Sequence, residues 1–176
     1  PLILRDNYDL PLLPYRPVER RENENGESWY KSEMYRYAAK KYPEKFGINT
    51  VTIGELITGE YPEDPVSSVD SEAPDSYVHN GQDIADSVAA ITKKYFMLYQ
   101  LDMSDPKIRE TYNQFLRGGV MLVDAVEQLF DKYNIKATVA IEPAYIHGKI
   151  PLKISHERGA KSYSFSKGYH EGEVIF

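Results

Sequence analysis

The side chains that could bind a metal or move a proton are sparse in this sequence. It contains four histidines, His79, His147, His156 and His170, and no cysteine. Two of the histidines are each followed by a glutamate, which would make a His/Glu metal site if they converged, but their spacing matches no metal-ligand motif. We therefore expect no metal and no cofactor, and interpret the histidines as residues of exposed turns. Without cysteine the sequence has no disulfide, thiolate-bound zinc, iron–sulfur cluster or thiol catalysis.

A second candidate chemistry is cation binding by the acidic segment 60–81. Carboxylate oxygens are ligands that Ca²⁺ prefers, but these acids do not alternate around a central glycine as in a calcium-binding loop. We favour a solvated loop and keep calcium as the alternative. Residues 48–92 contain no lysine or arginine, so the negative excess behind the net charge of −6 lies there and makes nucleic-acid binding unlikely. The acids are Glu60, Glu63, Asp64, Asp70, Glu72 and Asp75.

A third candidate is the first residue, Pro1. A free N-terminal proline is a secondary amine that can act as a base when burial lowers its pKa. The start Pro1-Leu2-Ile3-Leu4 resembles the small tautomerases, which use such a proline at the beginning of an apolar strand. The resemblance covers four residues, and the proline-rich continuation departs from it. It implies an N-terminal-proline tautomerase-like enzyme, which is the least favoured of our three functional hypotheses.

The elements that must position these side chains are organised around residues 83–133. Apolar residues recur there at alternating intervals of four and three, which places them on one face of a helix. We predict two helices, with Ser104 as the N-cap of the second and Pro106 in its first turn. Asn134 would close the second helix in a left-handed conformation. The apolar series are Ile84, Val88, Ile91, Tyr95 and Leu98, then Ile108, Tyr112, Phe115, Gly119, Leu122, Val126, Leu129 and Tyr133.

Two adjacent glycines, Gly118 and Gly119, interrupt the second series. Each costs about 1 kcal/mol relative to alanine in a helix interior, so a kink is one interpretation. We favour a continuous helix because the apolar spacing survives the glycines. A glycine at a buried position would also leave room for close approach by another helix, and we expect the β region or a neighbouring subunit to cover residues 122–133.

The predicted fold is α+β and mainly helical, with a central antiparallel helical hairpin, a small C-terminal antiparallel β region and an extended N-terminal arm. We divide the chain into a proline-rich arm (1–27), a single globular domain (28–155) and a C-terminal β/tail segment (156–176). Residues 135–141 and 162–166 alternate as strands do, and residues 144–154 resemble a β-hairpin that turns at His147-Gly148, with Pro151 on an edge strand. The remaining predictions are a helix at 28–42 and, at 48–57, either a short strand or the slightly preferred short helix.

The composition favours an interaction role. The sequence holds 15 tyrosines and one tryptophan, residue types that are enriched at protein interfaces. We therefore expect a structural or assembly protein of a multi-subunit particle, for example a viral capsid-associated or tail-connector protein, located in the cytoplasm or a virion. The alternative is a small accessory subunit of a cytoplasmic enzyme complex. The expected partners are protein subunits, in a homo-oligomer or hetero-assembly, with no membrane contact and no signal peptide. The candidate interface residues are Leu12, Leu13, Tyr15, Trp29, Gly118, Gly119, Tyr163, Phe165 and Phe176.

Overall fold

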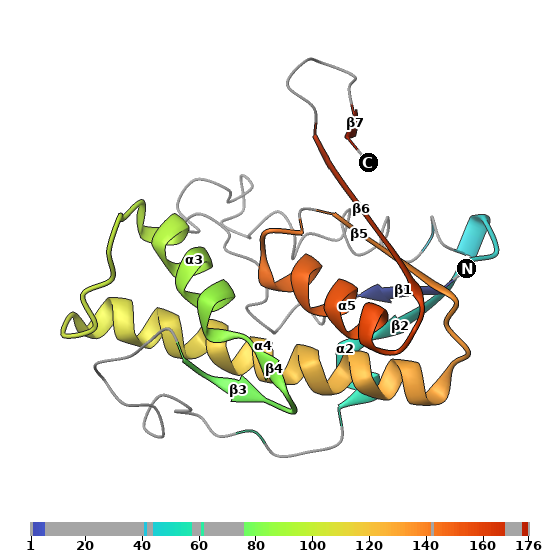
Figure 1. The fold of residues 1–176 in the computed structure, drawn as a ribbon, viewed down its shortest axis with the longest axis horizontal. Helices are drawn as coiled ribbons and strands as arrows, with labels where there is room; N and C mark the ends of the chain where they lie inside the picture. Colours follow the sequence, from blue (N-terminus) through green and yellow to red (C-terminus); the bar gives the residue numbers. More distant parts are fainter. Residues whose placement is uncertain are drawn as a thin grey trace.

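Helix α4, Pro106–Lys132, is the axis around which the other elements pack (Figure 1). The computed structural model describes residues 2–5, 41, 44–57, 61, 76–141, 143–167 and 174–175. The arm beyond residue 5, the helix at 28–42 apart from Lys41, and most of the acidic segment lie outside these residues. So do five of the candidate interface residues, Leu12, Leu13, Tyr15, Trp29 and Phe176.

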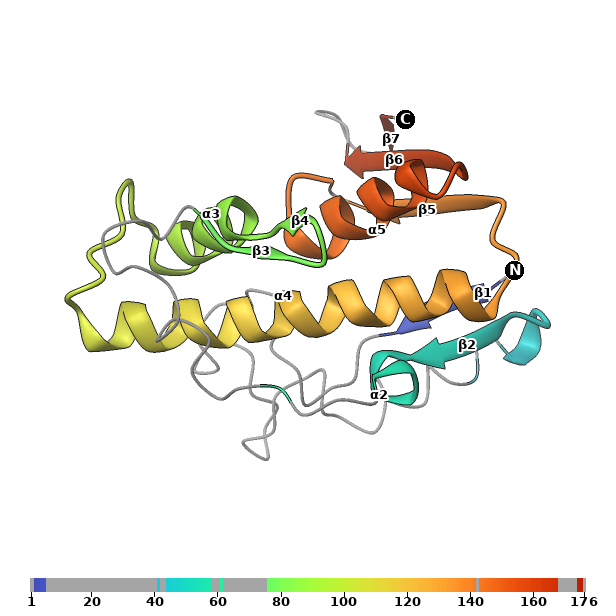
Figure 2. The same cartoon turned by 60° about the horizontal axis from the view of Figure 1, so that its bottom comes forward.

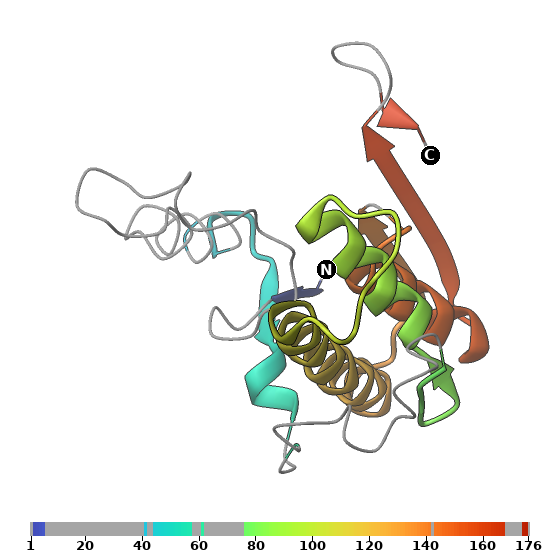
Figure 3. The same ribbon diagram turned by 90° about the vertical axis from the view of Figure 1, so that its left-hand side faces the viewer.

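The elements are stacked in layers about α4. Figure 2 shows α3 (Ala85–Phe96) and α5 (Ile146–Glu157) on the same face of α4, one beyond the other along its length. A sheet of β5 (Ala137–Ile141), β6 (Lys161–Lys167) and β7 (Val174–Ile175) lies outside α5. The opposite face of α4 carries β1 (Leu2–Arg5), β2 (Asn49–Thr52) and α2 (Ile53–Leu56), as the end-on view in Figure 3 confirms.

Burial on both sides explains the composition of α4. Seven of the predicted positions, from Ile108 to Leu129, are buried, and Tyr133 at the end of the series is half-buried. Further apolar residues outside the predicted stripe are buried as well, because α2 packs against the face that α3 and α5 leave open. These additional core residues are Leu116, Val120, Met121, Val123 and Ala125.

The helix is continuous across Gly118-Gly119, as predicted. A Cβ at Gly119 would lie 2.5 Å from Cδ1 of Ile146 and 3.3 Å from Cδ1 of Ile84. Because it has no side chain, Gly119 leaves room for Ile146, the first residue of α5, and for Ile84, which precedes α3. The prediction of close approach by another helix is confirmed, and the helix belongs to this chain.

Both ends of α4 differ from the prediction. Asp105, rather than Ser104, is the N-cap, and its Oδ1 accepts hydrogen bonds from the N–H groups of Lys107 (2.8 Å) and Ile108 (3.4 Å). The Ser104 hydroxyl instead donates to Asp102 at 2.6 Å. Proline fits the first helical position, so the residue directly before Pro106 becomes the cap. The helix ends on Tyr133 in an extended conformation, and Asn134 is not left-handed.

The structure does not show the predicted hairpin of two long helices. Helix α3 has 12 residues against 27 in α4, and it ends at Phe96, where Met97 adopts a left-handed conformation with φ 58°. Leu98 therefore lies in the 97–105 connection and is exposed. Since α3 is short, the remaining length of the α4 face is covered by α5.

The predicted β-hairpin at 144–154 is wrong, because this segment is helix α5. Ile146, Ile150 and Ile154 recur every four residues and are all buried against the core, which favours a helix. Pro151 lies inside that helix rather than on an edge strand. The burial of the three isoleucines outweighs the hydrogen bond that the proline removes.

The C-terminal β region is consequently of mixed type rather than antiparallel. Strands β5 and β6 pair in parallel, with Ala137 opposite Lys161 and Ile141 opposite Phe165, and α5 forms the crossover between them. Only β7 pairs antiparallel, at Ser166 and Lys167 beyond the end of β5. The predicted strands at 135–141 and 162–166 are both present.

Two small β elements complete the described fold. At 48–57 both alternatives occur in succession, strand β2 followed by α2, and β2 pairs in parallel with β1. Strands β3 (Val78–His79) and β4 (Gln82–Asp83) form a hairpin across Asn80-Gly81. Both turn residues have positive φ (48° and 77°), which is the geometry that Asn-Gly favours in tight hairpins.

Candidate functional site

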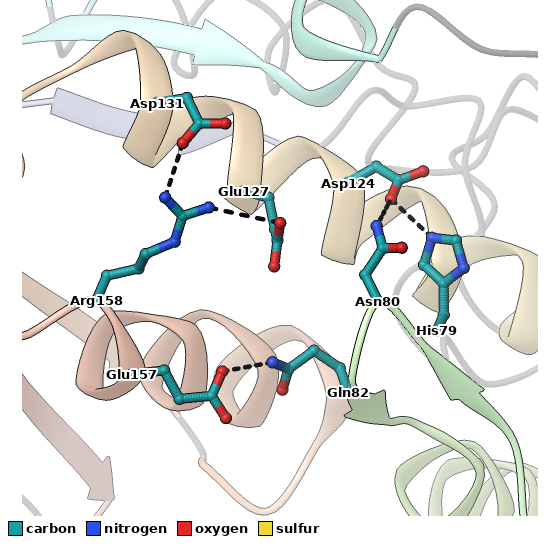
Figure 4. Close-up of polar contacts among 8 residues, drawn as sticks. All are labelled: His79, Asn80, Gln82, Asp124, Glu127, Asp131, Glu157 and Arg158. Carbon is teal, nitrogen blue, oxygen red and sulfur yellow. Dashed lines mark hydrogen bonds and ion pairs between the residues drawn. The ribbon is translucent and has the colours of Figure 1, made fainter.

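The densest polar cluster in the described part of the chain converges on Asp124 of α4 (Figure 4). Its Oδ1 lies 2.7 Å from Nε2 of His79 and accepts a hydrogen bond of 2.9 Å from Nδ2 of Asn80. Its Oδ2 accepts a hydrogen bond of 2.9 Å from the Tyr61 hydroxyl. One carboxylate therefore holds the β3–β4 hairpin and Tyr61 against the central helix.

The same side of α4 carries two further acids, one and two turns along the helix. Glu127 and Asp131 both bind the guanidinium of Arg158, which follows α5, at 3.5 and 2.7 Å (Figure 4). Nearby, Nε2 of the buried Gln82 donates to Glu157 at 2.5 Å. The polar stripe of α4 thus connects the central helix to the hairpin and to the end of α5.

The contacts of this cluster are made within the chain. Both oxygens of Asp124 are already hydrogen bonded within the chain. Among the residues that the structure describes, no group of three or more histidines and acids could hold a metal ion. We interpret the three hydrogen bonds of Asp124, with Tyr61, His79 and Asn80, as an internal structural contact and call them the Asp124 latch. The sequence carried one signal for it, because residues 124, 127 and 131 recur at intervals of three and four.

The latch changes the acid–base behaviour of Tyr61. Burial first, then the hydrogen bond to Asp124 and the charge of that carboxylate, raise the pKa of Tyr61 well above its ordinary value of 10.0. A group whose pKa is raised in the folded state contributes stability below its unfolded pKa and loses it as the pH rises further. Tyr61 is therefore expected to destabilise the fold progressively above about pH 10.

Replacing Tyr61 by phenylalanine should reduce this alkaline loss of stability. The expected result is a shallower fall in the free energy of unfolding between pH 9 and 11, with up to about one proton less released on unfolding. Urea titrations across this range measure the slope. The control is Tyr99→Phe, because that side chain is 92% exposed and changes its surroundings little on unfolding. Equal slopes in the two variants would contradict the assignment.

Exposed large apolar side chains of the described residues gather at two places, and two more, Phe46 and Val78, are exposed singly elsewhere. Val139 and Tyr163 are 64% and 51% exposed and lie opposite each other on β5 and β6. They occupy the sheet face that α5 leaves uncovered, which we call the outer face, whereas the neighbouring Ala140 is buried. The second place is the α3–α4 connection, where Met97, Leu98 and Tyr99 are exposed in succession at the far end of α4 from the sheet (Figure 1).

The predicted interface residues fall into three groups. Tyr163 is exposed on the outer face, and Phe165, on the same strand, is half-buried. Gly118 and Gly119 are buried inside the chain, where Gly119 meets α5. The other five lie outside the described residues, as does Pro1. Strand β1 does begin at Leu2, the residue after the proposed catalytic proline.

The three histidines that the structure describes lie in a strand and a helix. The prediction of exposed turns is wrong for the three described histidines, because His79 lies in β3 and both others lie in α5. Only His156 is exposed, whereas His147 is half-buried and His79 is partly buried against Asp124. Within the described ranges, no helix is both long enough and apolar enough to cross a membrane.

Comparison with known proteins finds no match to any family model, curated protein or solved structure.

Proposed function

We propose that this chain is a structural subunit of a protein assembly and that it contacts neighbouring proteins through apolar surface outside its own core. The observation that carries the proposal is the outer face of the β5–β6 sheet. Parallel strands are normally covered on both faces, but here α5 covers one face and Val139 and Tyr163 stand exposed on the other. A neighbouring protein would supply the missing layer.

The second apolar surface supports a role among several neighbours. Met97 and Tyr99 are 78% and 92% exposed. The backbone of Met97 is left-handed, a conformation that residues other than glycine seldom adopt. Because this connection and the outer face lie at different ends of the molecule, one subunit can contact two neighbours at once (Figure 1). This arrangement suits a subunit of a multi-subunit particle, including a virion, better than an accessory subunit with a single binding partner.

Site-specific photo-crosslinking tests the proposal in the native source. A photoreactive phenylalanine derivative at position 163 should crosslink to one defined protein, and one at position 99 should also give a defined product. The matched control is position 128, an exposed glutamine on the polar side of α4. A Val139→Ser substitution should reduce the crosslink from position 163. The proposal fails if position 163 yields no more product than position 128.

A further inference from the structure

Strand β5 has an open edge. Among the described residues it pairs with β6 alone, and β7 lies on the other side of β6. The carbonyl of Lys136 accepts a hydrogen bond of 3.0 Å from the N–H of Lys161 on β6. Because successive residues of a strand direct their backbone groups to opposite sides, Ala137 and Val139 direct their N–H and C=O groups away from β6. These groups have no partner in the described structure.

In the part of the chain that the structure describes, this edge lacks the devices that normally prevent pairing between chains. Edge strands are usually protected by lysine, proline, a bulge or a covering segment. The five residues of β5, Ala-Thr-Val-Ala-Ile, include no charge and no proline. The strand combines open backbone groups at its edge with an exposed valine on its outer face, so both kinds of contact needed for strand addition are available together.

We propose that two copies of this chain pair through β5 in antiparallel fashion about a twofold axis that passes beside Val139. The inference rests on the proposed function and names a neighbour at the edge of the sheet, in addition to the protein that would cover its outer face. A twofold axis requires antiparallel self-pairing, and the resulting interface closes after two copies. Val139 of each copy then exchanges two backbone hydrogen bonds with Val139 of the other, and the two sheets become one.

The strand is complementary to itself in this register. Centring the pair on Val139 sets each residue opposite the one equally far on the other side, so Ala137 of one copy opposes Ile141 of the other. The five residues of the strand carry no charge, so the self-pair sets no like charges opposite each other. On the outer face, Val139 of both copies forms a continuous apolar stripe flanked by Tyr163 of both copies.

Single cysteines test the geometry, because the chain contains none of its own. In the proposed pair the two Cα atoms at position 139 lie about 5.5 Å apart, within the range that a disulfide spans. The two at position 163 are separated by three strand spacings, about 14 Å, which no disulfide can bridge. Mild oxidation should therefore crosslink Val139→Cys into a dimer and leave Tyr163→Cys monomeric. Crosslinking of Tyr163→Cys alone, of both variants equally or of neither would overturn the proposal.

A backbone substitution gives a second, independent test. Val139→Pro removes the N–H that points away from β6 and leaves the β5–β6 hydrogen bonds in place, so the monomer should still fold. Val139→Thr is the matched control because it keeps the N–H and the branched side chain. Sedimentation should show a dimer for the native chain and for Val139→Thr. For Val139→Pro the dissociation constant of the dimer should be at least about tenfold higher, because two hydrogen bonds are lost.

The outcomes also separate this inference from the proposed function. If the native chain sediments as a monomer while position 163 crosslinks to a different protein, self-pairing is wrong and the assembly role stands. If position 163 crosslinks to nothing in the native source and the purified chain does not dimerise, both are wrong.

Discussion

Replacing Gly119 by leucine is expected to lower the free energy of unfolding by about 3 kcal/mol, at the upper end of the range for overpacked cores. Even a single added carbon at this position would lie 2.5 Å from Cδ1 of Ile146, closer than side chains normally approach. Ile146 and Ile84 are both buried on the facing elements and have little room to withdraw. Leucine would add three more carbons to the same space, so α5 would have to move away from α4.

Chemical denaturation measures this change, with Gln128→Leu as the control. Residue 128 is an exposed position on the same helix, so leucine there should alter stability by no more than about 0.5 kcal/mol. Nearly equal stability of the two variants would contradict the close packing of α5 on Gly119.

A double-mutant cycle identifies the atom responsible. Gly119→Ala gains helix propensity worth about 1 kcal/mol but places its methyl group against Ile146. Ile146→Val removes the Cδ1 atom and by itself should cost about 1 kcal/mol. In the double variant the valine relieves the contact, so the pair should be more stable than the sum of the single changes predicts. Additive effects would show that this contact does not limit the space at position 119.

The sequence predicts helix α4 well because that helix depends on local periodicity and on a recognisable start. The four-and-three spacing and Pro106 at the first position are readable without tertiary information, although the predicted cap, Ser104, lies one residue before the actual cap, Asp105. Gly119 marked a place of close approach for the same reason, since a glycine at a core position of a long helix must have a packing partner. Only the identity of that partner required the structure.

Helix α5 could not be recognised because two opposing signals share one segment. Pro151 and the His147-Gly148 pair indicate a turn between strands, whereas Ile146, Ile150 and Ile154 indicate one face of a helix. The choice depends on α4, whose apolar surface extends beyond the end of α3 and needs cover. Once this segment is a helix, β5 and β6 become parallel and the uncovered outer face follows. The candidate interaction surface was therefore predictable only at Tyr163, and its opposite residue Val139 was not identified.

The Asp124 latch was missed for a different reason, and its removal gives the other large expected effect. Asp124→Ala should lower the free energy of unfolding by about 2 to 3 kcal/mol, because three donors lose a charged acceptor in a partly buried site. Nothing in the local sequence links Asp124 to His79 and Asn80, which lie 45 and 44 residues earlier in the chain. The pairing arises only when the hairpin folds onto the central helix.

Two further variants show whether the effect belongs to these hydrogen bonds. Asp124→Asn keeps one carbonyl acceptor and should lose only about 1 kcal/mol. Asp131→Ala removes an acid from the same side of the helix, but its ion pair with Arg158 is largely exposed and should contribute about 0.5 kcal/mol or less. In Asp124→Ala alone, hydrogen exchange should accelerate in the β3–β4 hairpin and remain slow in α5. If Asp124→Ala and Asp131→Ala prove equally stable, the hairpin is held by apolar contacts instead, above all those of the buried Ile84 that directly follows its second strand.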